Sequence, residues 1–429
     1  MSASKTKALP ASPSRTAGSI FLTGLAKTKL YWGLAVLILF GTFSSPLTSK
    51  GANIFLSLGN QTDVLRQVSV TGIVAVGMTL VIFIAGIDLS VGSIMALGTV
   101  ICAMLLTQEG WTSASYFAVP ATGIVLFIVA LGVVGFIHSA IRSTRNTVYA
   151  GSEMASRLTI IGVAAIFAIA SMYWLSGQVD QKFGVLAVLL AVPCIGAVMG
   201  SINGSLIVHG RLQPFIVTLA MMVGALGLAR VIAGQDTAVY PVYTGSNATE
   251  TFEVLRSLVW GIIPVPGLFF IAILVIFFLV TRFTNYGSYL LAIGGNEEAS
   301  RLAGINVDRT KIATYAIAGG LSALAGILYV AQFRQGKPDA GMGLELDAIA
   351  AVVIGGTSLM GGRGSVMGTL VGVLIFGFLS NILQLNNIDS NTQLILKGMI
   401  IIAAVLIQEG RLEGISLVLK QVFGPKRKL

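Results

Sequence analysis

The sequence predicts an all-α protein, a polytopic transmembrane helical bundle of about 10–12 spans with glycine-interrupted segments and both termini in the cytoplasm. Of its 429 residues, 55% are hydrophobic and 10% are charged, whereas about 25% of a soluble globular domain is charged. Several runs contain no Asp, Glu, Lys or Arg and reach the ~20 apolar residues that a helix needs to cross a bilayer. These runs are 110–141, 158–179, 183–208, 257–281, 312–333 and 364–388.

Taken in chain order, the apolar segments predict twelve spans, because each can satisfy its backbone hydrogen bonds in lipid only as a helix. The predicted spans are 30–47, 64–85, 89–107, 117–139, 159–176, 183–208, 213–233, 262–281, 312–333, 346–360, 364–384 and 392–408. The first is expected to be a retained span, because a long polar tail precedes it and no small-residue cleavage pattern follows it.

The placement of charge predicts the topology. Basic residues outnumber acidic ones before the first span and after the last, and positive flanks mark the cytoplasmic side. We therefore expect a basic, polar N-terminal cytoplasmic tail over 1–29, a transmembrane domain over 30–410 and a basic C-terminal tail over 411–429. The same rule places the 282–311 loop in the cytoplasm. Because the net charge of +10 lies at membrane ends, its expected partners are membrane lipids and not nucleic acid.

Two glycine-rich breaks interrupt apolar sequence, at 86–93 and 355–365. Glycine-interrupted segments in corresponding halves of a transporter indicate an internal repeat with a central substrate site. Two ordinary tight turns between antiparallel helices would explain the same pattern, and the sequence leaves both interpretations open.

Residues 285–312 are polar and lie between two apolar segments. Asn296 is expected to cap a short helix through its side-chain oxygen, with acidic residues in the first turn where the helix dipole favours them. Gly304 is expected to end that helix in a left-handed conformation. A short helix with one apolar face and a charged rim suits a groove in another protein, although a solvated connector remains an alternative. The residues of this docking hypothesis are Gly294 and Gly295 as a flexible lead, Asn296, Glu297, Glu298, Ala299, Arg301, Leu302 and Gly304.

Polar residues within apolar sequence are candidates for a translocation pathway or gate. A carboxylate at Asp88 is unfavourable in a membrane unless it is paired or hydrated. It is expected to shape a pathway or gate, to cap the helix that follows by accepting amide hydrogens near Ser90, or to do both. Hydrogen bonds between helices are the alternative for the uncharged members of the set. The candidates are Gly86, Asp88, Ser90, Asn203, Thr218, Gln332 and Thr357.

The sequence does not predict an enzyme. His138 and His209 have no carboxylate at catalytic spacing, and Cys102 and Cys194 fall within predicted spans without metal-ligand spacing. No metal site or catalytic residue is predicted. The phosphate-binding pattern Gly-x-x-x-x-Gly-Lys-[Ser/Thr] does not occur in the chain, so the sequence does not predict that this chain binds ATP itself.

Four motifs resemble those of the ribose-type family of ATP-binding-cassette (ABC) sugar permeases. They occur in the order of that family and cover about residues 60–410. The motifs are 86–93 (GIDLSVGS), 203–204 with 214–219 (NG and PFIVTL), 291–305 (LAIGGNEEASRLAGI) and 348–365 (AIAAVVIGGTSLMGGRGS).

The resemblance implies a multi-pass permease subunit in a bacterial inner membrane. It implies a homodimer or paired permease, an ABC ATPase subunit that binds ATP and Mg²⁺, and a periplasmic sugar-binding protein; this chain itself is expected to bind no cofactor. This sequence departs from the pattern of the ribose-type permeases at 110–180. Two additional predicted spans there resemble the longer xylose-permease branch. A pentose or hexose is the expected substrate, with a weak preference for xylose. The alternatives are a branched-chain amino acid ABC permease and an ion-coupled secondary sugar transporter.

Overall fold

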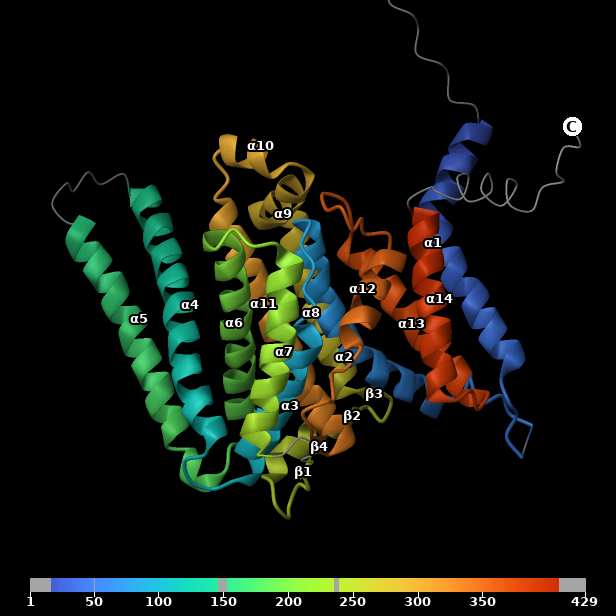
Figure 1. Cartoon of the computed structure of the whole chain (residues 1–429), viewed down its shortest axis with the longest axis horizontal. Helices are drawn as coiled ribbons and strands as arrows, with labels where there is room; N and C mark the ends of the chain where they lie inside the picture. The colour runs from blue at the N-terminus through green and yellow to red at the C-terminus, as the bar shows by residue number, and fades with distance from the viewer. Residues whose placement is uncertain (1–16, 50, 146–152, 235–238, 409–429) are drawn as a thin grey trace, which may run out of the picture.

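The computed structural model describes residues 17–49, 51–145, 153–234 and 239–408, and most of this chain is helical (Figure 1). The tail segments 1–16 and 409–429 lie outside the described residues. The α-helices are α1 Ala17–Ser44, α2 Leu58–Phe83, α3 Val91–Thr107, α4 Ser113–Arg145, α5 Glu153–Ser176, α6 Val185–His209, α7 Pro214–Ala233, α8 Val265–Phe283, α9 Asn285–Gly295, α10 Glu297–Leu302, α11 Val307–Phe333, α12 Leu344–Ile354, α13 Val366–Leu385 and α14 Ser390–Gln408.

The polytopic helical bundle predicted from composition is confirmed. Within the described residues, eight helices are long and apolar enough to cross a membrane. They are α2, α4, α5, α6, α7, α8, α11 and α13. Helix α3 and residues Tyr31–Ser44 of α1 form shorter apolar helices.

The predicted span at 346–360 is wrong. Helix α12 has 11 residues and is therefore about 16 Å long, roughly half the ~30 Å of a hydrocarbon core. It ends because Gly355 and Gly356 follow it, and Gly356 has a φ of +86° that continues no right-handed helix. The chain instead turns through the second glycine-rich break before α13 begins.

The two ends of the bundle differ in the elements that connect the spans (Figure 1). Helices α9 and α10 project beyond the spans at one end, which we call the α10 end and which the charge rule predicts to be cytoplasmic. At the opposite end, β1 (Tyr240–Pro241) pairs with β4 (Gln335–Gly336), and β2 (Leu258–Val259) pairs with β3 (Ile263–Pro264). Two 3₁₀ helices, η1 (Val179–Gln181) and η2 (Glu250–Arg256), also belong to the connecting segments.

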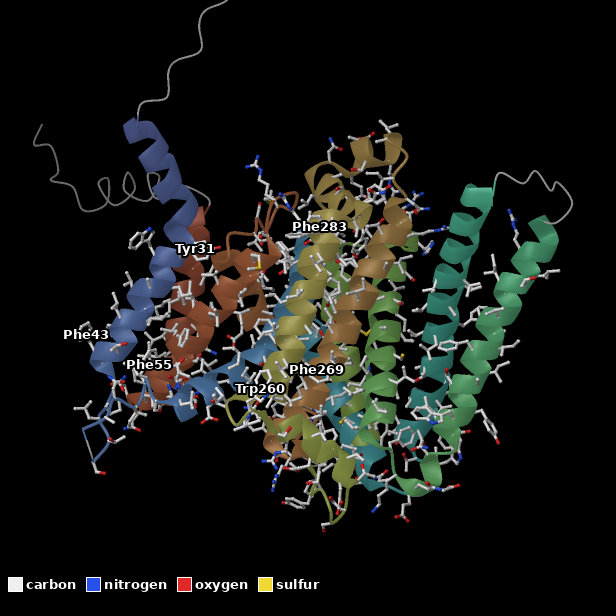
Figure 2. All side chains as sticks on the ribbon, turned by 180° about the vertical axis from the view of Figure 1, so that it is seen from behind. Tyr31, Phe43, Phe55, Trp260, Phe269 and Phe283 are labelled. Carbon is white, nitrogen blue, oxygen red and sulfur yellow. The ribbon has the colours of Figure 1, made fainter. Side chains whose placement is uncertain are left out.

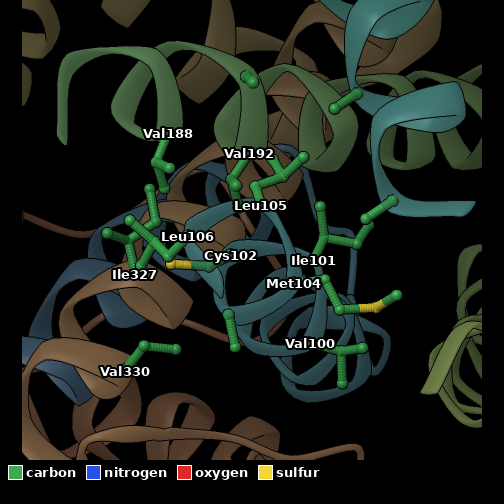
Figure 3. Packing of buried hydrophobic residues seen from close by; sticks show 14 of the residues in the cluster. Val100, Ile101, Cys102, Met104, Leu105, Leu106, Val188, Val192, Ile327 and Val330 are labelled. Atoms are coloured by element: carbon green, nitrogen blue, oxygen red, sulfur yellow. The ribbon is translucent and has the colours of Figure 1, made fainter. Parts of the chain in front are cut away.

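Helix α11 forms the centre of the bundle and packs against α2, α3 and α6. A Cβ atom at Gly319 of α11 would overlap the Gly196 carbonyl of α6, so these two helix backbones are in contact. Such approach is how helices associate in lipid, where packing replaces the hydrophobic drive. Figure 3 shows the core beside this contact, with side chains from α3, α6 and α11. Cys102 is buried in it as a free thiol.

Large apolar side chains project outward from the helices (Figure 2). Phe43 is 86% exposed and Phe283 is 73% exposed. A soluble protein rarely leaves such contiguous apolar surface in water, whereas a membrane-spanning bundle presents it to lipid tails. Helices α4 and α5 lie together at one edge of the bundle, and α1 lies beside α13 at the other (Figure 1).

Candidate functional site

Helix α10 has the local structure expected from its sequence. The Asn296 side-chain oxygen accepts a hydrogen bond from the Ala299 amide at 2.9 Å and caps the helix. Glu297 and Glu298 occupy the first turn. Gly304, with a φ of +84°, lets the chain leave the helix in the left-handed conformation that glycine adopts without strain.

Ion pairs attach α10 to the start of α11. Lys311 donates to Glu297 at 2.6 Å, and Arg301 pairs with Glu297 at 3.1 Å and also with Asp308. Partial burial would raise the pKa of Glu297, but Lys311 and then Arg301 outweigh burial and hold that pKa below its usual value. Two members of the predicted charged rim, Glu297 and Arg301, are thus engaged within the chain.

The apolar face of α10 is uncovered. Leu302 is 85% exposed, and Ala299 and Ala303 beside it are exposed as well. Glu298 is exposed and forms no ion pair with the residues that the structure describes. The exposed surface of α10 therefore includes Leu302 with its alanine neighbours and Glu298.

The prediction that Gly294 and Gly295 form a flexible lead is wrong. Both belong to the last turn of helix α9. A Cβ atom at Gly294 would overlap the Phe83 carbonyl oxygen and would lie 2.6 Å from the Gly362 amide nitrogen, whereas a Cβ at Gly295 would meet no atom within 4 Å. Gly294 is needed for close packing. A Gly-Gly pair in a sequence is compatible with close packing and with flexibility, and the sequence alone does not separate the two.

The second glycine-rich break meets the end of α2, just before the first break, beside α9. The Gly362 amide donates a hydrogen bond of 3.1 Å to the Phe83 carbonyl at the end of α2. Gly361, with a φ of +80°, lies against Ala85, so that a Cβ at this position would be 2.7 Å from the Ala85 nitrogen. Segments separated by more than 270 residues thus share one junction at the α10 end, and the sequence contains no signal for their proximity.

Four candidate pathway residues come together in the first break. Asp88 is buried, and its Oδ1 accepts hydrogen bonds from the Ser90 amide at 2.9 Å and the Ser90 hydroxyl at 2.6 Å. The Asn203 side-chain amide of α6 donates to Ser90 Oγ at 2.9 Å. Thr218 of α7 donates to the Ile87 carbonyl at 3.2 Å. Asp88 thus closes a turn onto Ser90, the N-cap residue of α3, and no side chain caps that helix. The hydrogen bonds of Asn203 and Thr218 connect the break to two spans.

The remaining three candidates occupy different places. Gly86 lies against Tyr315 of α11, where a Cβ atom would be 2.5 Å from the phenol oxygen. Thr357 is buried in the second break beside Gly364. Gln332 is the second-to-last residue of α11 and lines a small cavity with Arg66 and Arg256, away from the other candidates. The sequence did not predict a role for Tyr315, because nothing in the sequence indicates that a tyrosine within an apolar run packs against Gly86.

A groove of about 730 Å³ separates α10 from the turn between α6 and α7. Charged groups of both signs line it, together with apolar residues of the turn. Its lining residues are Ile207, Val208, His209, Arg211, Leu212, Pro214, Glu297, Arg301, Asp308 and Lys311. A cavity of about 320 Å³ shares several of these residues and extends to Gly86, Gly294 and Tyr315. Open space therefore reaches from the flank of α10 to the first break.

A bundle of apolar spans with a projecting, ion-paired surface helix is the architecture of a multi-pass membrane protein. Residues 154–405 match the protein family described as branched-chain amino acid transport system / permease component. The chain belongs to this family.

Individual relatives are similar over most of the chain. The ribose import permease of Haemophilus influenzae is 36% identical over 357 residues, covering 82% of this chain and 85% of the relative. The ribose import permease of Bacillus subtilis is 35% identical over 377 residues, covering 88% and 91%. The xylose transport system permease of Escherichia coli is 35% identical over 367 residues, covering 83% and 86%. No solved structure matches the chain.

The comparisons confirm the resemblance to ribose- and xylose-type permeases that the four motifs indicated. The chain is a transport subunit and not an enzyme, and its apolar helices and family make it a multi-pass protein of the bacterial inner membrane. Because the identities to the ribose and xylose permeases are nearly equal, the preference for xylose stays a prediction.

Proposed function

We propose that this chain is the membrane-spanning subunit of an ATP-driven importer that moves a monosaccharide, a pentose or hexose, across the inner membrane. The exposed apolar face of α10 is the observation that carries the proposal. A leucine that is 85% exposed on a capped, ion-paired helix is held ready for a partner, because the helix is already ordered and loses little entropy on binding.

The partner of this face is an ABC ATPase subunit that binds ATP and Mg²⁺. Helix α10 enters a groove of the ATPase with Leu302 as its apolar anchor and Glu298 at its rim. Glu297 and Arg301 hold α10 to α11, so that a force on the helix reaches the spans. A periplasmic sugar-binding protein delivers the substrate at the opposite end, and two copies of the chain line the pathway between them.

The inner gate lies at the first glycine-rich break. Asp88, Ser90 and Asn203 form a buried hydrogen-bonded group there, and a neutral sugar is recognised by hydroxyl, amide and carboxylate groups of this kind. ATP-driven closure of the ATPase displaces α10 and shifts the bundle between outward-open and inward-open states. The protein catalyses no bond change, and the ATPase supplies the bias between its two conformations.

Replacing Leu302 by aspartate tests the docking role. Leu302→Asp is expected to prevent co-purification of the ATPase and to abolish ATP-dependent uptake in proteoliposomes, because a carboxylate would be buried without a partner. Leu302→Met keeps an apolar anchor of similar volume and is expected to retain both. Full uptake by Leu302→Asp would refute the docking surface, and concentration of sugar by the permease alone would refute an ATP-driven mechanism.

A branched-chain amino acid permease is the second candidate, because the family description names that substrate class. Proteoliposomes containing the complete transporter distinguish the two. Radiolabelled pentose or hexose is expected to accumulate with ATP and the cognate binding protein, whereas accumulation of leucine without any sugar uptake would assign the chain to the amino acid class.

A further inference from the structure

We propose that Gly294 is a positioning residue that transmits the movement of α10 to both glycine-rich breaks. This inference rests on the proposed function, because it assigns a route to the motion that the ATPase imposes. The route starts at α10, passes through the last turn of α9 and reaches the end of α2 and the second glycine-rich break at Gly362.

Backbone atoms of three segments meet at Gly294. On one side lies the Phe83 carbonyl, the last of α2, and on the other lies the amide of Gly362. These two groups are joined by their own hydrogen bond of 3.1 Å. Gly362, with a φ of +69°, also approaches α9, where its Cβ would lie 2.9 Å from the Gly295 Cα. No side chain separates the three backbones, so none can change rotamer to absorb a displacement.

Helix α9 is attached to α2 by apolar packing as well. Leu290 and Ile293 are fully buried in a cluster with Leu80, Val81 and Phe83 of α2. The packing holds the glycine junction together when α10 is displaced. Because Asn296 is both the residue after α9 and the cap of α10, the two helices are joined without a flexible linker.

The far side of the junction leads directly to the proposed gate. Five residues after Phe83 the chain reaches Asp88, whose partner Ser90 accepts from Asn203 of α6. Ala85 lies between them with a φ of +58°, a conformation that is unfavourable for a residue with a side chain. A shift of the Phe83 carbonyl therefore alters a turn that is already strained and changes the position of the buried polar group.

Replacing Gly294 by alanine tests the route. Gly294→Ala adds one methyl group that overlaps the Phe83 carbonyl and separates α9 from the breaks, while the exposed face of α10 is unchanged. The permease is expected to co-purify with the ATPase in normal amount, but the number of sugar molecules imported per ATP hydrolysed is expected to fall roughly tenfold. A structural defect alone would lower transport and hydrolysis together and leave this ratio unchanged.

Two further variants control for the loss of a glycine. Gly295→Ala makes the same change in helix propensity one residue later, in open space, and is expected to lower the ratio less than Gly294→Ala does. Gly132→Ala in α4, where no atom lies within 4 Å of the added methyl group, is expected to leave transport unchanged. A normal transport ratio in Gly294→Ala would overturn the proposal.

Cross-linking addresses the case in which Gly294→Ala fails to fold. Cysteines placed at Gly295 and at Met360, which is 76% exposed in the second break, can be joined by a flexible bismaleimide because Cys102 and Cys194 are buried. If α9 and the break move as one unit, the cross-linked transporter is expected to import sugar at the rate of the unlinked one. Arrest by the cross-link would overturn the inference. Failure of the wild-type chain to bind the ATPase would instead refute the proposed function.

Discussion

Asp88 allows the structural and functional interpretations of the first break to be separated by experiment. The side chain is fully buried, and its Oδ1 accepts from both the amide and the hydroxyl of Ser90. Asp88→Ala removes this acceptor. A buried amide without a partner costs about 1–3 kcal/mol, and loss of the hydroxyl bond adds about 1 kcal/mol because the hydroxyl can rotate elsewhere. The expected loss of stability is therefore about 2–4 kcal/mol.

Asp88→Asn keeps an oxygen acceptor in the same position and removes the charge. The asparagine oxygen accepts weaker hydrogen bonds than a carboxylate, but its burial avoids the cost of burying a charge. Because these two effects oppose each other, the free energy of unfolding is expected to change by less than about 1 kcal/mol. Thermal unfolding of the purified permease in detergent measures both variants. At about 2 °C per kcal/mol for a chain of this size, the alanine variant is expected to melt about 4–8 °C lower than wild type.

Uptake by reconstituted transporter completes this test. If the role of Asp88 is structural, Asp88→Asn is expected to import sugar with ATP at close to the normal rate. Loss of uptake at a wild-type melting temperature would refute this reasoning and show that the negative charge itself takes part in transport. Selective loss of gradient-driven uptake would support the ion-coupled alternative. A double-mutant cycle with Ser90→Ala is expected to be non-additive, because the two side chains share a hydrogen bond of 2.6 Å.

Further predictions concern α10 and the topology. Asn296→Ala should destabilise α10 by about 1 kcal/mol, seen as increased mobility of a spin label at Ala303. The pKa of Glu297 is lowered in the folded chain, so its ion pairs stabilise α10 above the usual glutamate range and are lost as pH falls through the lowered value. The same label should become mobile only in that acidic window, and Glu297→Gln should abolish the transition. A cysteine at Asn247 should be labelled from the periplasmic side, and labelling only from the cytoplasm would contradict the topology. Gln332→Ala should leave uptake within about twofold, because it removes at most a peripheral hydrogen bond; a larger loss would return Gln332 to the pathway.

Features set by local chemistry were predictable from the sequence. Asn296 and Gly304 mark the ends of α10 because capping and left-handed turns depend on neighbouring residues alone. The apolar runs likewise indicate helices, since lipid leaves the backbone no other partner. Helix α9 was not anticipated, because its glycines and polar residues resemble those of a connector.

Features set by contacts between distant segments were not predictable. Gly294 and Gly362 meet across the fold, and a single sequence contains no record of that pairing. The short α12 also escaped prediction, because the apolar pair Leu359 and Met360 was included in the span while the backbone conformation of Gly356 ends the helix. Gln332 was grouped with the other candidates by residue type, although it lies at the C-terminal end of α11, away from them.

The two attachments of α10 lead to the same point in the bundle. Through Glu297 and Lys311, α10 is tied to α11, and Tyr315 lies one turn beyond Lys311 on the same face of that helix. The Tyr315 phenol packs against Gly86. Through Gly294, α10 is tied to the end of α2, three residues before Gly86. Under the proposed function, a displacement of α10 acts on Gly86 from both α2 and α11, and the small residue at this position lets the two helices shift relative to each other without a collision.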